Sequence, residues 1–257
     1  MSGAENIRLG PLTAMICAES SWRGKDHFPS SQAWADDVER VLSFLQIEGQ
    51  FERYLPMLRG KLNQRDGALA EARVGFFFQR NGFQILSWEP AGDAGKTGEF
   101  EVQWRDTDPM FVEVKGPRWE GELASDEKTG PRRQGPKYVN GEARNLDSVG
   151  KVIDCMKKAG PKFLPDKPNL LVVAGYLLFV SPRLLKANII LPQLESALSK
   201  PVFSRIGGVA IFDVFCRGSS VEYQMVFQEN PAASTECSLP DTVTKGLKEG
   251  NRRGFRC

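Results

Sequence analysis

The residues best placed to do chemistry lie in a short apolar run, Phe111 to Gly116, which carries a glutamate and a lysine two residues apart. Alternate side chains of a β-strand point to opposite faces, so Glu113 and Lys115 would share a face with Phe111. Charges among large apolar side chains cost free energy unless another group compensates them. The run therefore raises the question of what lies beside this pair.

A second run, Glu99 to Trp104, supplies further carboxylates. Glu99 and Glu101 would share one face of this strand, and the short turn RDTDP would make it the antiparallel neighbour of the strand that carries Glu113. In one of the two facings, these glutamates lie on the same side as Glu113 and Lys115. Converging carboxylates repel one another unless a cation joins them, and oxygen ligands suit Mg²⁺ or Mn²⁺. A metal there could bind a phosphate oxygen and lower the pKa of a bound water.

The hydrophobic periodicity and the turn residues predict the elements that must position these side chains. In chain order they are two or three helices within 32–62, a helix from Asp66 as N-cap to residue 80, strands over 83–88, 99–104 and 111–116, a helix over 142–159, a strand over 170–180, a helical segment over 181–200, and a hairpin of strands over 207–215 and 221–229. Residues 1–30 read as irregular.

This order predicts an α/β fold with a mixed central sheet, an N-terminal helical segment and a C-terminal hairpin. The first three strands would form an antiparallel meander, and the continuous apolar run Leu170 to Val180 would be a strand buried on both faces. We expect three units: an irregular and helical segment over 1–63, an α/β core with an extension over 64–228, and a mobile polar and basic tail over 229–257.

The stretch GEFEV, Gly98 to Val102, followed by EVK, Glu113 to Lys115, resembles the signature of the PD-(D/E)xK nuclease superfamily. A Gly-Glu pair stands where that superfamily commonly has Pro-Asp. The predicted order helix, three strands, helix, strand over residues 64–180 also resembles its αβββαβ, restriction-endonuclease-like core.

The resemblance implies a metal-dependent nuclease that uses Mg²⁺ or Mn²⁺ to hydrolyse phosphodiester bonds. It implies that Glu99, Glu113 and the backbone carbonyl of Val114 bind the metal. Lys115 would handle the attacking water, and Glu71 would reach the metal directly or through water. Glu101 is the reserve ligand.

The implied partner is nucleic acid, with DNA favoured over RNA. The loop 117–141 contains Arg132, Arg133 and Lys137, which could meet a phosphate backbone, beside aromatic side chains that could stack on bases. Acidic residues nearly cancel the charge of this loop, so a solvated surface loop is the alternative interpretation.

Other interpretations compete at each position. Glu113 and Lys115 could form a salt bridge on a solvated face, worth under about 1 kcal/mol, and Glu71 could be solvated or paired with Arg73. The stretch PAGDAGKT, Pro90 to Thr97, resembles a P-loop but lacks its first glycine and precedes a predicted strand, so it favours a flexible hairpin loop. A nuclease-like fold used only for binding nucleic acid or protein is the alternative function, with 32–62 as an interaction surface or homodimer interface.

The composition excludes several other classes of protein. The 257 residues are 41% hydrophobic and 26% charged with a net charge of +2, an ordinary globular composition. The five cysteines include no CxxC pair, which excludes a zinc ribbon, and the single histidine, His27, excludes an HExxH site. The longest apolar run is shorter than the about 20 residues that span a bilayer, and the N-terminal residues make a poor secretory signal. We therefore expect a cytoplasmic location.

Overall fold

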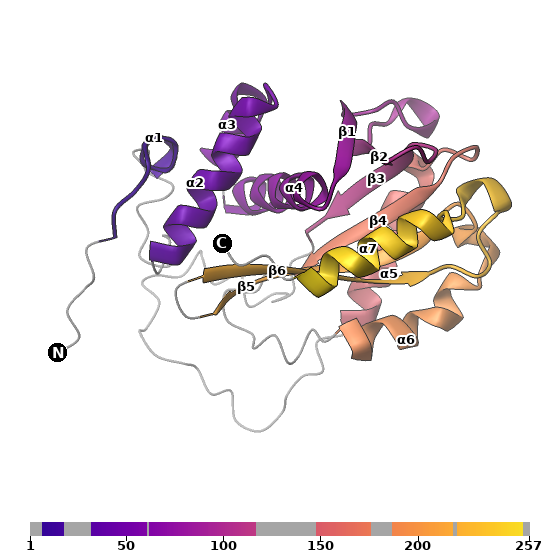
Figure 1. Ribbon diagram of the computed structural model, residues 1–257. Coiled ribbons are helices and arrows are strands. Elements are labelled where there is room, and N and C mark those ends of the chain that lie inside the picture. Colours follow the sequence, from indigo (N-terminus) through magenta and orange to yellow (C-terminus); the bar gives the residue numbers. More distant parts are fainter. Residues whose placement is uncertain are drawn as a thin grey trace, which may run out of the picture.

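A six-stranded mixed sheet forms the centre of the molecule (Figure 1). This computed structural model describes residues 7–17, 32–60, 62–116, 148–175, 187–217 and 220–253. The strands lie in the order in which they occur in the chain: β1 (Phe83–Trp88), β2 (Phe100–Trp104), β3 (Met110–Lys115), β4 (Asn169–Gly175), β5 (Gly208–Arg217) and β6 (Ser220–Glu229). Strand β4 runs parallel to both β3 and β5, whereas the outer pairs are antiparallel.

Helices cover both faces of the sheet. They are α1 (Pro11–Cys17), α2 (Gln32–Ile47), α3 (Phe51–Leu58), α4 (Leu62–Arg80), α5 (Ser148–Ala159), α6 (Ala187–Leu198) and α7 (Asp241–Arg253). Short 3₁₀ turns lie at 93–95, 160–162, 201–203 and 235–237. Within the described ranges, no helix is long and apolar enough to cross a membrane.

Alternate residues of the central strands enter two separate hydrophobic cores. Val112 of β3 and Val172 of β4 pack on the face covered by α4 and α7. Phe111 and Val173 pack on the opposite face, against α5 and α6. Coverage of both faces explains why β4 is a continuous apolar run rather than an alternating one.

The N-terminal helices α2 and α3 pack on α4 through a third core, in which Leu42 and Tyr54 meet Leu69 and Ala72. The apolar positions of these helices are therefore used within the chain. The predicted unit boundary at 63/64 falls inside helix α4 and stays a prediction.

A buried polar network reinforces this packing. Arg73 of α4 donates from Nε and Nη2 to Oδ2 of Asp37 in α2, at 3.0 and 2.6 Å. Tyr223 of β6 donates its hydroxyl proton to the other oxygen of Asp37. All three residues are buried, and a buried charge is retained at low cost only when it is paired and hydrogen-bonded in this way.

The predicted α/β fold is confirmed, including the succession helix, three strands, helix, strand. Several local predictions are wrong. Helix α4 begins at Leu62, so Asp66 lies inside it rather than at its N-cap. Residues 11–17, expected to be irregular, form α1, whose Thr13 binds the carboxylate of Glu39 through both its backbone N–H and its hydroxyl, at 2.7 and 2.8 Å.

The prediction of a mobile tail from residue 229 is also wrong for its described part. Residues 241–253 form α7, and its Val243 and Leu247, one helical turn apart, are buried in the core beneath the sheet. Two apolar residues at this spacing suffice to dock the helix, although polar residues dominate its composition.

Candidate active site

Glu99 immediately precedes β2, and Glu113 lies in the neighbouring strand β3. Phe100 pairs with Val112 and Glu101 with Phe111, and the backbone N–H of Glu99 donates to the carbonyl of Val112 at 3.1 Å. Both Glu99 and Phe100 therefore lie beside Val112, and Glu113 is the next residue of β3. The pairing of Glu101 with Phe111 puts Glu101 on the face of the sheet that carries Glu113 and Lys115.

The close approach of the two strands depends on Gly98. A Cβ atom at this position would overlap the aromatic ring of Phe111, so only glycine lets the chain pass over that ring. The backbone N–H of Gly98 donates to the carbonyl of Pro90 at 3.0 Å, and the carbonyl of Glu99 accepts from Glu89 at 3.1 Å. Glu99 is thereby held between two neighbouring chain segments.

Glu113 is a fully buried carboxylate shared by two lysines. Its Oε1 accepts a hydrogen bond from Nζ of Lys115 and lies 2.6 Å from Nζ of Lys162. Its Oε2 is buried and has no hydrogen-bond partner. The salt bridge on a solvated face is therefore the wrong description of this pair, because water does not reach the carboxylate.

Sequence patterns did not reveal Lys162. Helix α5 ends at Ala159, Gly160 and Pro161 follow, and Lys162 closes the 3₁₀ turn that leads towards β4. Its Nζ also lies 4.0 Å from Oε1 of Glu99, so one ammonium group lies between the two carboxylates. A lysine just after a helix-ending Gly-Pro pair is the only local signal, and it does not identify a partner on another strand.

Glu71 of α4 belongs to the same electrostatic cluster. Burial, and then the charge of Glu99, raises the pKa of Glu71 to about 8. Burial, and then the charge of Glu113, raises the pKa of Glu99 to about 7. Burial alone would lower the pKa of Lys115, but the charge and hydrogen bond of Glu113, with the charge of Glu99, raise it overall. The site therefore holds carboxyls that resist ionisation beside an ammonium group that keeps its proton.

The N-terminal helices contribute to this cluster as well. The Arg53 guanidinium of α3 lies 4.8 Å from the ring centre of Tyr54 and 3.4 Å from Oε1 of Glu89. Its positive charge opposes the rise in the pKa values of Glu71 and Glu99. Burial, and then the charge of Glu71, raises the pKa of Tyr54 well above its ordinary range. Arg73, the partner that the alternative interpretation offered for Glu71, binds Asp37 of α2.

The donor set fits a hard divalent cation in its chemistry. Glu71, Glu99 and Glu113 supply carboxylate oxygens, and Oε2 of Glu113 is a buried acceptor without a donor. In the part of the chain that the structure describes, however, no three acidic, histidine or cysteine side chains are already gathered closely enough to hold an ion. Lys115 approaches the Val114 carbonyl, the other predicted ligand, at 3.4 Å.

Other predicted site residues lie elsewhere. Glu101 pairs with Phe111 across the strands and binds Nζ of Lys167 at 2.6 Å, and its role as reserve ligand stays a prediction. Arg132, Arg133 and Lys137 lie outside the described residues. The loop that resembles a P-loop closes with a bridge between Ala91 and Thr97 and leads into β2, not into a helix, as expected of a hairpin loop.

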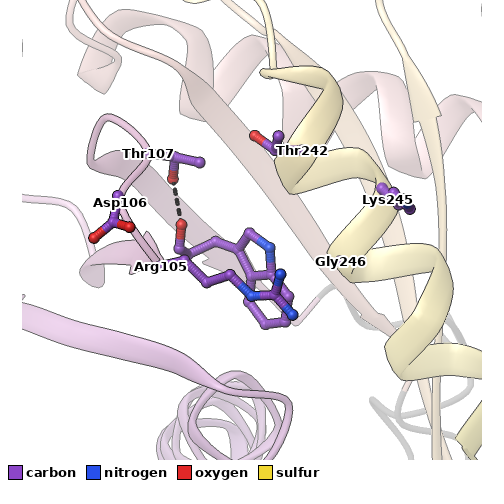
Figure 2. Close-up of a pocket in the computed structure, with 7 residues that line it drawn as sticks. Arg105, Asp106, Thr107, Thr242, Lys245 and Gly246 are labelled. Atoms are coloured by element: carbon purple, nitrogen blue, oxygen red, sulfur yellow. Dashed lines mark hydrogen bonds between the residues drawn. The ribbon is translucent and has the colours of Figure 1, made fainter.

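A cavity of about 370 Å³ lies at the opposite end of β2 from Glu99 (Figure 2). Its lining comes from the β2–β3 turn and from α7: Trp104, Arg105, Asp106, Thr107, Thr242, Lys245 and Gly246. The Arg105 guanidinium lies 5.0 Å from the ring centre of Trp104, and Thr107 donates its hydroxyl proton to the Trp104 carbonyl at 2.8 Å. This cavity is separate from the carboxylate cluster.

Comparison with known proteins gives little further identification. No family model matches the chain, and no curated protein matches it. The chain is similar to the structure of SfsA from Pyrococcus furiosus determined in complex with Ca²⁺, with 13% sequence identity and a TM-score of 0.24. The match covers 67% of this chain and 63% of SfsA, which is less than two thirds of that protein. The case for a site therefore rests on the geometry of this chain alone.

Proposed function

We propose that this protein is a metal-dependent nuclease of the PD-(D/E)xK type, with nucleic acid, DNA before RNA, as its substrate. The observation that carries the proposal is the fully buried Glu113 carboxylate, which two lysines contact. The second of these lysines, Lys162, also lies 4.0 Å from Glu99. A cluster this costly to bury is typical of a functional site, because a structural ion pair does not need additional carboxyls with raised pKa values.

Each residue has a role in this proposal. Glu99, Glu113 and the Val114 carbonyl would hold Mg²⁺ or Mn²⁺, with Glu71 as a direct or water-mediated ligand. The bound ion would lower the pKa of a water molecule and neutralise charge on the phosphate. The neighbouring carboxylates keep Lys115 protonated, so it would orient the water or the phosphate by donating hydrogen bonds, not accept the proton.

Cleavage of mixed substrates tests the proposal directly. Single- and double-stranded DNA and RNA are incubated with Mg²⁺ or Mn²⁺ and either the original protein or Lys115→Ala. We expect the original protein to cleave at least one substrate, Lys115→Ala to be inactive but folded, and EDTA to stop the reaction. Lys167→Ala is a matched control, because Lys167, like Lys115, pairs with a glutamate. Its partner is Glu101 of β2, and Lys167 lies outside the cluster. Equal cleavage by the original protein and Lys115→Ala would refute the lysine assignment.

One observation favours a second function, a catalytically silent fold that only binds nucleic acid or protein. Two ammonium groups already neutralise Oε1 of Glu113, as a cation would. A silent protein should show no stabilisation by Mg²⁺ or Mn²⁺, and Glu113→Gln should not change its binding. Calorimetric titration of the metal into the original protein and into Glu113→Gln separates the two functions.

A further inference from the structure

Two ammonium groups meet one carboxylate oxygen in the cluster, but the proposed reaction uses only one of them. Lys115 lies on strand β3, where its Nζ also approaches the Val114 carbonyl. Lys162 reaches the same oxygen of Glu113 from the 3₁₀ turn after α5. Its ammonium group has three N–H donors, and its ion pair with Glu113 engages a single carboxylate oxygen. Lys162 is therefore equipped to bind a second anion while it stays at Glu113.

The turn that carries Lys162 is held in place from the sheet side. Arg205 donates from Nη1 to the carboxylate of Asp93 and also to the carbonyl of Phe163, at 3.4 Å in the second case. These contacts join the loop before β2 to the residue that follows Lys162. The backbone of Lys162 is thereby fixed, while its side chain remains 22% exposed at the edge of the cluster.

The charges of the cluster favour a role for the Lys162 ammonium group when a phosphate binds, because carboxylates repel phosphate. Lys115, Lys162 and Arg53 supply positive charge around the three carboxyls of the cluster, of which Glu71 and Glu99 have raised pKa values. A divalent cation would make the site positive enough to attract a phosphodiester. Without Lys162, the carboxylates would offset more of the charge of that divalent cation, and less of it would attract the phosphate.

We propose that Lys162 is a substrate-binding residue, which holds a non-bridging oxygen of the scissile phosphodiester while Lys115 orients the water. This inference rests on the proposed nuclease function and adds to it the residue that receives the phosphate. A lysine suits this role because it binds phosphate as a compact point charge, and its three N–H donors let it contact Glu113 and the phosphate at the same time.

The chain offers a matched control for Lys162. Lys167 follows it in the same connection before β4 and also lies 2.6 Å from a glutamate oxygen, that of Glu101. Its side chain is 30% exposed, close to the exposure of Lys162, but its partner faces Phe111 and not Glu113. Loss of an ion pair as such should therefore affect both lysines alike, whereas loss of a phosphate contact should affect Lys162 alone.

The experiment measures oligonucleotide binding apart from cleavage. Fluorescein-labelled oligonucleotides, one single-stranded and one duplex, are titrated with Lys115→Ala protein in Mg²⁺, and their anisotropy gives the Kd. Adding Lys162→Ala should weaken binding of the preferred oligonucleotide about tenfold, as expected for a charged hydrogen bond. Adding Lys162→Arg should restore most of the affinity, and adding Lys167→Ala should leave it unchanged. Calorimetry with Mn²⁺ should show that Lys162→Ala does not weaken metal binding.

Two results would overturn the proposal. One is an equal effect of Lys162→Ala and Lys167→Ala on the Kd, which would make Lys162 a structural ion-pair partner. The other is absence of Mg²⁺-dependent binding of both oligonucleotides. Melting temperatures of all variants identify any loss of folding, and Lys162→Gln replaces Lys162→Ala if the latter unfolds. If binding depends on Lys162 but the original protein cleaves nothing, the catalytic proposal fails while this one stands.

Discussion

Replacing Glu71 by glutamine would remove a charge from the carboxylate cluster while keeping the shape of the side chain. Burial and the charge of Glu99 raise the pKa of Glu71 to about 8, from an ordinary value of 4.5. At pH 7 the folded protein therefore keeps a proton on Glu71 that the unfolded chain has released. Stability present at low pH is lost as the pH rises from 4.5 through the folded-state pKa of about 8.

The size of the effect follows from the difference between the two states. The pH of 7 lies 2.5 units above the ordinary pKa of 4.5 that the carboxyl has in the unfolded chain, and this difference corresponds to about 3 kcal/mol at about 1.36 kcal/mol per unit. Glutamine carries no titratable proton and avoids this cost, so the free energy of unfolding of Glu71→Gln should exceed that of the original protein by about 3 kcal/mol. For a chain of this length, each kcal/mol shifts the melting temperature by about 2–4 °C. An increase of several degrees is therefore expected in EDTA.

Thermal unfolding followed by circular dichroism at pH 7, in EDTA and in Mn²⁺, measures both halves of the prediction. Mn²⁺ should raise the melting temperature of the original protein but hardly that of Glu71→Gln, which has lost a ligand. Glu52→Gln, an exposed change on helix α3, is the control and should behave like the original protein. A Glu71→Gln protein that melts at or below the original temperature in EDTA, or that gains as much from Mn²⁺, would refute the reasoning.

Three further changes test other parts of the structure. Glu113→Gln should lower the free energy of unfolding in EDTA by about 2 kcal/mol, and with it the melting temperature, because two ammonium groups lose their shared carboxylate. An unchanged melting temperature would mean that water screens this pair. Burial raises the pKa of Asp213 from 3.8 to about 7, so the free energy of unfolding of the original protein should fall by about 4 kcal/mol as the pH rises across that interval. Urea titrations at several pH values should show this loss in the original protein and in the control Asp106→Asn, a change at an exposed residue, but not in Asp213→Asn. Gly246→Ala would place a Cβ 2.8 Å from a ring carbon of Trp104. This overpacking should cost about 1–3 kcal/mol and outweigh the gain of about 1 kcal/mol in helix propensity. Equilibrium unfolding followed by tryptophan fluorescence would detect the loss of stability, and a more stable variant would contradict the prediction.

Local patterns predicted the two strands of the site and which residues share a face on each. Alternation placed Glu99 with Glu101 and Glu113 with Lys115, because side chains in a strand have a period of two. It could not choose between the two facings of the strands, because that choice depends on register. The structure resolves it through the pairing of Phe100 with Val112.

The rest of the site depends on contacts between distant parts of the chain. Lys162 and Arg53 come from a turn and from a helix that share no periodic pattern with the strands of the site. Hydrophobic periodicity predicted helices within 32–62, but not that Tyr54 of α3 would lie beside Glu71. Such neighbours follow from how whole elements pack, and the packing is set by the three cores rather than by any one segment.

The network of Asp37, Arg73 and Tyr223 has a consequence for how the protein becomes functional during its synthesis. Tyr223 is 186 residues from Asp37 in the chain, and Arg73 follows Glu71 by one intervening residue on the same helix. Until strand β6 has been synthesised, Asp37 would lack one of the hydrogen bonds that hold it beside Arg73, on the helix that carries Glu71. The carboxylate cluster would therefore gain this support only after residue 223 has left the ribosome.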